Sequence, residues 1–312
     1  MMITDDFEKR REIITKFAEL GAMMLPVEEF MHIVFLNFHA EIEAELFTIA
    51  EQHQIEPKNE IWSIFEQAVD QCDFDHPILQ AVFSNTLIRQ LIGPEYTIFN
   101  RYPKVYEYLL RKKPAGEFNI AVIGCSYGQE IMSMLKCLHE EMAKNPDFSP
   151  KIDIFNKPTS IFQKVQTNIR YPESVLKKHL TPQQLAVDFT VDEHGSLHFS
   201  EAFYQRMGFY ELDLFDVPHE PNSTKQYDLL MIHNVLQYLE PSEGQDISIF
   251  QQQAEAAFQW IVQQVKPSGM VSIINESKKP NDFVAELQDR IFNQHYACTI
   301  VKPAYLYTKQ AI

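Results

Sequence analysis

Hydrophobic residues recur every three to four positions through the first part of the chain. The spacing is clear at Phe30, Ile33 and Val34, and it predicts amphipathic helices. Glycine, which disfavours helix interiors, is almost absent before Gly93. We therefore predict an N-terminal all-helical domain over residues 1–92, and we take Gly93 and the proline after it as the break before the next domain.

Residues 93–312 change to short apolar runs that alternate with amphipathic segments, which predicts an α/β domain. Helices are expected over residues 129–143, 249–265 and 281–292. Only three residues separate the last two predicted strands, so these strands are expected to pair as an antiparallel hairpin. The predicted strands are Asn119–Gly124, Ile152–Asn156, Gly208–Leu214, Tyr227–His233, Met270–Asn275, Ala297–Val301 and Tyr305–Thr308.

A loop with two glycines, Gly124 and Gly128, joins the first predicted strand to the helix that follows. Strand, glycine loop and helix are how a doubly wound sheet brings its backbone close to a nucleotide-like ligand. The spacing matches neither G-x-G-x-x-G nor the G-x-x-x-x-G-K-[ST] of phosphate loops. It favours a ligand without phosphates, such as S-adenosylmethionine. The alternative is a tight turn that binds nothing.

The amino-acid composition disfavours several classes of function for this chain. The 312 residues carry a formal net charge of −16, which speaks against binding to nucleic acid. No apolar run approaches the ~20 residues of a membrane span, so no membrane insertion is expected. The four cysteines lack metal-ligand or disulfide spacing. We therefore expect no metal site and a reducing, cytoplasmic location.

Four stretches, in order, resemble the chemotaxis-receptor glutamate methyltransferases of the CheR type. Their family patterns are T-x-F-F-R, (A/G)-C-S-T-G-E-E-P-Y-S, F-D-x-I-x-x-R-N-V-x-I-Y-F and L-K-P-G-G. The matching segments here are Tyr96–Arg101, Gly124–Ser133, Tyr227–Leu239 and Val265–Gly269. The resemblance implies a Rossmann-like, seven-stranded class I methyltransferase sheet over residues 93–312. A small β-hairpin insertion is expected at Ala186–Phe199.

The resemblance also implies S-adenosylmethionine as cofactor and S-adenosylhomocysteine as product. Glu130 would bind the cofactor's ammonium group; alternatively, it is an acidic residue favoured in the first turn by the helix dipole. Asn156 stands where the family has an aspartate that binds the ribose hydroxyls. The other implied cofactor contacts are Thr97, Arg101, Gly124, Cys125, Ser126, Gly128, Asp213, Leu214, Asn234 and Val235.

Arg101 and Tyr238 correspond to the groups nearest the transferred methyl, so the resemblance implies that they are catalytic. Without it, Arg101 reads as a surface ion-pair residue and Tyr238 as a core aromatic. A carboxylate acceptor has an ordinary pKa of about 4.3 and is ionised at neutral pH, so the reaction needs no general base. His233 replaces the family's arginine before Asn-Val, and we interpret it as structural.

The leading prediction is an S-adenosylmethionine-dependent methyltransferase that modifies a carboxylate of glutamate type, or a similar nucleophile, on a protein partner. One alternative is a small-molecule methyltransferase with the helical domain as a lid. Another is a catalytically silent binding module. Residues 28–72 are rich in glutamate, which disfavours an acidic chemoreceptor helix as acceptor. We expect no capture of a receptor's C-terminal peptide, and the oligomeric state is not predicted.

Overall fold

The computed structural model describes residues 24–53, 60–70, 76–78, 81, 99, 102–113, 116–217, 225–241, 244–275, 280–302 and 304–309. These residues fall into two compact units. The first contains described residues up to Phe99, with Asn168–His179 and Thr190–His198. The second contains described residues of Asn100–Thr167, Leu180–Phe189 and Phe199–Ile312. The division into domains at residues 92 and 93 stays a prediction.

The first unit is built on two of the helices that the apolar spacing predicts, α2 (Met24–His53) and α3 (Ile61–Asp70). Ile33 and Val34 of α2 are completely buried, and so is Phe65 of α3. Burial of such side chains supplies most of the stability of an amphipathic helix.

Asn37 on α2 binds a strand that lies far along the chain. Its Nδ2 donates to the carbonyl of Arg170 at 2.7 Å, and its Oδ1 accepts from the backbone N–H of Arg170 at 2.9 Å. The side-chain amide thus satisfies both backbone groups of one residue, as a neighbouring strand would. The elements of this region are β3 (Arg170–Tyr171), α9 (Glu173–His179), β4 (Phe189–Val191) and β5 (Leu197–Phe199), and the strands form a sheet in the order β3-β5-β4.

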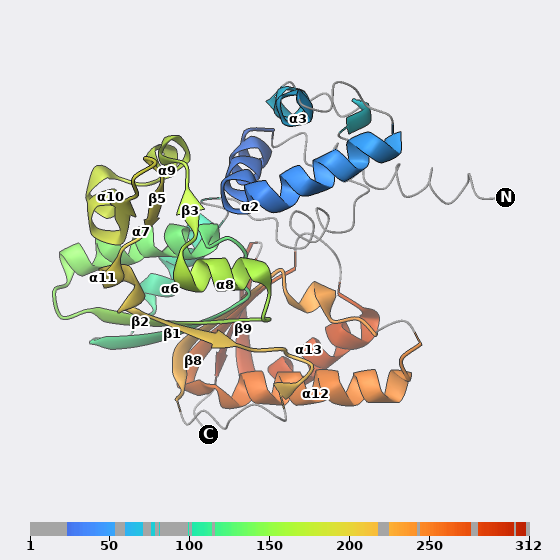
Figure 1. The fold of residues 1–312 in the computed structure, drawn as a ribbon. Coiled ribbons are helices and arrows are strands. Elements are labelled where there is room, and N and C mark those ends of the chain that lie inside the picture. Colours follow the sequence, from blue (N-terminus) through green and yellow to red (C-terminus); the bar gives the residue numbers. More distant parts are fainter. Residues whose placement is uncertain are drawn as a thin grey trace. The chain divides into compact units, whose positions relative to one another are not determined.

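Seven strands of the described residues form the sheet of the second unit, in the order β6-β2-β1-β7-β8-β10-β9 (Figure 1). β1 pairs in parallel with β2 and β7, while β10 pairs antiparallel with both β8 and β9. This is the strand order of the class I methyltransferase sheet, so the predicted fold class is confirmed. The strands are β1 (Glu117–Ile123), β2 (Ser149–Asn156), β6 (Met207–Glu211), β7 (Tyr227–His233), β8 (Val265–Ile274), β9 (Tyr296–Val301) and β10 (Ala304–Lys309).

Helices cover both faces of this sheet. Figure 1 shows α12 and α13 on one face, and α6, α7 and α8 on the other. The face toward α12 and α13 carries the main apolar core, with Leu230, Ile232 and Val271 packed against Phe258. The helices and helical turns of this unit are α6 (Pro103–Arg111), α7 (Gln129–Lys144), α8 (Ser160–Thr167), α10 (Pro182–Asp188), α11 (Glu201–Tyr204), η3 (Leu236–Tyr238), α12 (Ile247–Gln263) and α13 (Asp282–His295).

The predicted hairpin insertion is present as β4 and β5, but its first part is helical. Ala186–Asp188 belongs to α10, so the strand prediction is wrong there. Thr181 caps this helix, accepting from the Gln184 N–H while the Gln184 side chain accepts from the Thr181 N–H. The predicted third strand also ends early, at Glu211, which leaves Asp213 and Leu214 in the loop that follows.

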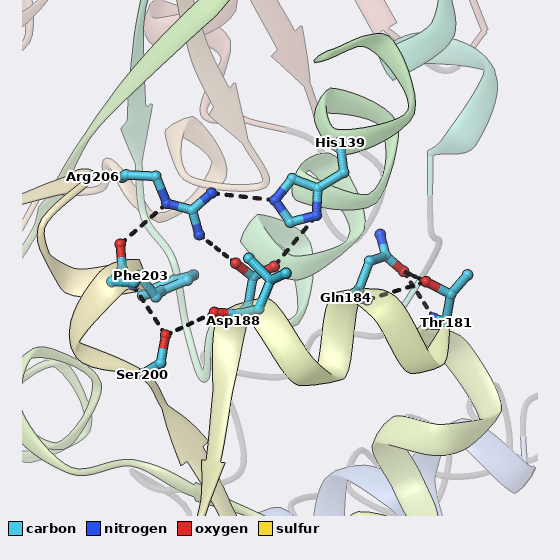
Figure 2. A network of polar contacts seen from close by, with 9 residues as sticks. His139, Thr181, Gln184, Asp188, Ser200, Phe203 and Arg206 are labelled. Atoms are coloured by element: carbon cyan, nitrogen blue, oxygen red, sulfur yellow. Dashed lines mark hydrogen bonds and ion pairs between the residues drawn. The ribbon is translucent and has the colours of Figure 1, made fainter. Parts of the chain in front are cut away.

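A buried polar network ties α7 to the insertion within the second unit (Figure 2). Asp188 is 2% exposed and forms an ion pair with Arg206. The Arg206 Nη1 donates to Nε2 of His139 at 3.2 Å, and the His139 Nδ1 lies 3.5 Å from the other Asp188 oxygen. Burial lowers the pKa of His139, as does the nearby Arg206 charge, although Asp188 acts in the opposite direction.

No helix among the described residues is long and apolar enough to cross a membrane.

Candidate active site

The loop between β1 and α7 holds three residues at positive φ. Gly124 has φ 80°, Ser126 has φ 48° and Gly128 has φ 85°. The Gly128 N–H donates to the Cys125 carbonyl at 2.8 Å, which closes the turn just before the helix begins. The two glycines take conformations that other residues adopt at a cost, so the sequence pattern and the backbone agree.

Gly124 is also required because of a neighbouring side chain. A Cβ built on Gly124 would lie 2.5 Å from Cγ2 of Val235, well inside normal contact distance. Val235 follows β7, the strand beside β1. The glycine therefore lets the loop and the end of β7 approach each other at the carboxyl edge of the sheet.

Glu130 lies in the first turn of α7 and has two protein partners on the same oxygen. The Tyr106 hydroxyl donates to its Oε1 at 3.0 Å, and Nδ1 of His233 contacts the same atom. The Glu130 side chain is 11% exposed. Among the described residues, nothing hydrogen-bonds to its Oε2. One carboxylate oxygen is thus fixed by the protein and the other is available.

His233 ends β7 and extends the same polar chain into the sheet. Its Nε2 lies 2.8 Å from Oγ of Ser272, a completely buried residue of β8. The ring of Tyr102 meets the imidazole edge-on, with centroids 5.4 Å apart. The Tyr102 hydroxyl in turn accepts from Nδ2 of Asn234 at 2.8 Å. These contacts place His233 between the first turn of α7 and the interior of the sheet.

Tyr106 on α6 is a permanent hydrogen-bond donor to Glu130. Burial raises its pKa well above the ordinary value, and the negative charge of Glu130 raises it further. The phenol therefore stays protonated at neutral pH. It can only hold the carboxylate in place and cannot act as a base.

Asn156 ends β2 and is partly buried. Its Nδ2 is buried without a hydrogen-bond partner among the described residues. An unpaired buried donor costs free energy of ~1–3 kcal/mol unless an acceptor reaches it. The atom lies at the carboxyl end of a central strand, where doubly wound sheets bind their ligands.

Asp213 and Leu214 lie in the loop after β6. The Asp213 Oδ1 accepts from the backbone N–H of Phe215 at 3.0 Å, and its Oδ2 lies 3.0 Å from Nζ of Lys157. Leu214 is 5% exposed and belongs to the core cluster. These contacts fix the loop that begins next to the end of β2, because the Leu212 N–H donates to the Asn156 carbonyl at 2.8 Å.

Asn234, Val235 and Tyr238 follow β7. Asn234 has φ 57°, a conformation that asparagine tolerates better than most residues. Tyr238 closes η3 and is 47% exposed, so its interpretation as a core aromatic is wrong. The predicted site residues Thr97 and Arg101 lie outside the described residues. The others meet at the ends of β1, β2, β6 and β7.

Within the described ranges, no group of three or more His, Cys, Asp or Glu side chains could hold a metal ion.

A surface groove of about 590 Å³ lies between α6 and α7, and none of the site residues described above lines it. This groove contains acidic and basic side chains from both helices, together with Cys137.

Sequence reasoning missed three members of the site: Tyr102, Tyr106 and Ser272. A polar Ser272 inside the apolar run of β8 was a readable signal, because a buried hydroxyl needs a partner. No comparable signal distinguished the two tyrosines, because their spacing on and before α6 is also that of ordinary core residues. His233 was noticed and interpreted as structural, but its contact with Glu130 could not be foreseen.

The strand order is that of a class I methyltransferase, and the described residues of the predicted site meet at the carboxyl edge of its sheet. The family model described as CheR methyltransferase, SAM binding domain, matches residues 97–257. That match covers more than half of the chain, and the chain belongs to this family. It is an S-adenosylmethionine-dependent methyltransferase. No curated protein matches the chain.

Several solved structures are weakly similar. A putative class I S-adenosylmethionine-dependent methyltransferase from Listeria monocytogenes is 10% identical with a TM-score of 0.45, over 94% of this chain and 89% of that one. S-adenosylmethionine-bound CalS10, an amino pentose methyltransferase from Micromonospora echinaspora, is 9% identical with a TM-score of 0.33, over 66% and 89%. Human N-acetylserotonin methyltransferase is 13% identical with a TM-score of 0.34, over 74% and 58%. The fold assignment rests on the strand order instead.

The residues present fit S-adenosylmethionine. The unpaired Nδ2 of Asn156 is a donor that a ribose hydroxyl oxygen can satisfy. The second oxygen of Glu130 suits an ammonium group, which forms charge-assisted hydrogen bonds. Both groups flank the Gly124–Gly128 loop at the same edge of the sheet.

Proposed function

We propose that this protein transfers a methyl group to a carboxylate of glutamate type on a protein partner, and that it does so in the cytoplasm. The observation that carries the proposal is the match of the CheR methyltransferase family model to residues 97–257. The protein acceptor, the ester product and the location go beyond that match. The protein acceptor and the ester product are what the CheR resemblance implies, and the location is supported by cysteines that lack disulfide spacing.

The proposed cofactor contacts are those that the family resemblance implies, and the geometry above supports them. Glu130 would bind the ammonium group, Asn156 a ribose hydroxyl, and Asp213 with Leu214 the adenine side. The backbone of Gly124, Cys125, Ser126 and Gly128 would lie under the methionine part, with Asn234 and Val235 beside it. Thr97 and Arg101 are proposed as further contacts from sequence alone. When bound, S-adenosylmethionine supplies a methyl group on a sulfonium sulfur.

The acceptor chemistry matches what the chain offers. A glutamate side chain is ionised at neutral pH, so its oxygen needs no base to become a nucleophile. What it needs is alignment and removal of water. Tyr238, half-exposed on η3, is proposed to orient the acceptor, together with Arg101. Because the acceptor is already ionised and these residues only orient it, a buried acid–base pair is not required.

The acidic surface of the first unit affects which proteins can serve as the methyl acceptor. Glu41 and Glu51 of α2 are exposed. Like charges repel at short range, so a strongly acidic helix is a poor partner for this surface. A glutamate on a neutral or basic protein segment is therefore the proposed acceptor.

The test uses methyl-labelled S-adenosylmethionine and a protein extract of the source organism. The proposal predicts label in the protein fraction that alkali releases as volatile methanol, which is the behaviour of a carboxyl methyl ester. Tyr238→Phe should lower the labelling rate while leaving the affinity for S-adenosylhomocysteine within about twofold. Alkali-stable label in protein would point to another nucleophile. Label confined to small molecules would favour the small-molecule alternative.

A further inference from the structure

The carboxylate of Glu130 is held through only one of its two oxygens. Oε1 accepts from Tyr106 at 3.0 Å and contacts Nδ1 of His233, whereas Oε2 has no hydrogen bond among the described residues. Because both contacts are made to Oε1, the carboxylate is held in one orientation and Oε2 points in a fixed direction. Tyr106 and His233 come from α6 and β7, so two separate elements fix Glu130 at the start of α7.

His233 can change its charge without losing either contact. When the ring is neutral, Nδ1–H donates to Glu130 and Nε2 accepts from the Ser272 hydroxyl. When it is protonated, both nitrogens donate, and the Ser272 oxygen accepts instead. A serine hydroxyl serves in both roles because it rotates. The two states differ in the net charge beside Glu130 and in little else.

The surroundings of His233 contain few charges. The groups that face it are Glu130 from α7, Ser272 from β8 and the ring of Tyr102 ahead of α6, while Tyr106 reaches it through Glu130. Among the described residues, Glu130 is the ionised group in contact with the ring. The His233 side chain is 2% exposed, so water screens this pair poorly.

We propose that His233 is a positioning residue that ties cofactor affinity to pH. It fixes Glu130 through Oε1 and leaves Oε2 for the cofactor's ammonium group. When His233 becomes charged, it neutralises the carboxylate and weakens the attraction for a second cation. Affinity therefore falls when His233 takes up a proton. The inference rests on the proposed role of Glu130 and is independent of the methyl acceptor.

The test is calorimetric titration with S-adenosylhomocysteine between pH 8.0 and 5.5. The wild-type affinity should fall by about tenfold, the order expected for a unit charge placed several ångströms from the ligand ammonium at a partly buried site. His233→Asn keeps a neutral donor near the position of Nδ1 but cannot titrate. It should bind within about threefold of wild type at pH 8.0 and lose most of the pH dependence.

Two further measurements separate the possible failures. Glu130→Ala at pH 8.0 tests the premise, because unchanged affinity would mean that Glu130 does not bind the ammonium group. In the wild-type protein, NMR titration of the His233 ring needs no variant to fold. At a fixed pH, adding S-adenosylhomocysteine should move the ring signals toward those of the neutral imidazole, as linkage requires. Equal pH dependence in wild type and His233→Asn, or ring signals that do not respond to the ligand, would overturn the inference.

Discussion

Gly124 and Val235 are packed so closely that no side chain fits between them. A Cβ on Gly124 would lie 2.5 Å from Cγ2 of Val235. The contact joins the loop after β1 to the residue that follows β7 by two positions. Because both segments belong to the proposed cofactor site, this contact sets the spacing of that site.

Gly124→Ala should therefore destabilise the protein by about 2–4 kcal/mol. About 1 kcal/mol comes from forcing alanine to positive φ, and the rest comes from overpacking against Val235. Gly116→Ala is the matched control, since Gly116 has φ +86° and a Cβ built on it would meet nothing within 4 Å. Urea denaturation should give a smaller loss of about 1 kcal/mol for the control. Equal losses in the two variants would show that the Val235 contact is unimportant.

The His139–Asp188–Arg206 network predicts a pH-dependent stability. Burial lowers the pKa of His139 below its ordinary 6.5, so the unfolded chain takes up a proton first as the solution is acidified. This contribution to the free energy of unfolding is present above pH 6.5 and is lost as the pH falls toward the folded-state value. Urea denaturation at pH 7.5, 6.5 and 5.5 measures it.

His139→Gln is the control for that experiment. Glutamine has an oxygen that can accept from Arg206 and has no charge to gain. Its stability should change less than that of wild type between pH 7.5 and 5.5. Parallel curves for the two proteins would assign the pH dependence to other groups.

Asn156→Asp should bind S-adenosylhomocysteine more tightly, by about three- to tenfold. The carboxylate replaces an unpaired buried donor with two charged acceptors for the ribose hydroxyls. Asn156→Leu, which removes all hydrogen bonding at similar size, should bind more weakly than wild type. Calorimetry at pH 8.0 measures both, and a weaker Asn156→Asp complex would contradict the proposed ribose contact.

Much of the fold was predictable because its determinants are local. Six of the seven strands of the main sheet were expected within about three residues of their observed ends, since apolar runs bounded by breakers carry that information. The seventh, β8, was predicted from Met270 but begins at Val265, which was expected to end the preceding helix. The capping residues Thr181 and Gln184 of α10 were equally readable, and overlooking them caused the error at Ala186–Asp188.

Other features depend on contacts between distant segments. β3 is two residues long and has no pattern of its own, and its attachment to α2 relies on the contact between Asn37 and Arg170. The site shows the same limit. Glu130 and the glycine loop were named from the sequence, whereas the chain from Tyr106 through Glu130 and His233 to Ser272 combines four separate elements.

The most direct test of the account is calorimetric titration of S-adenosylhomocysteine into wild type, Glu130→Ala and Glu140→Ala. Glu140 is an exposed residue on the same helix and serves as the matched charge control. Wild type and Glu140→Ala should bind equally. Glu130→Ala should lose about 1.5–3 kcal/mol, the contribution of a hydrogen bond to a charged group. No heat from wild type at near-millimolar ligand, or equal affinity for all three proteins, would contradict the account.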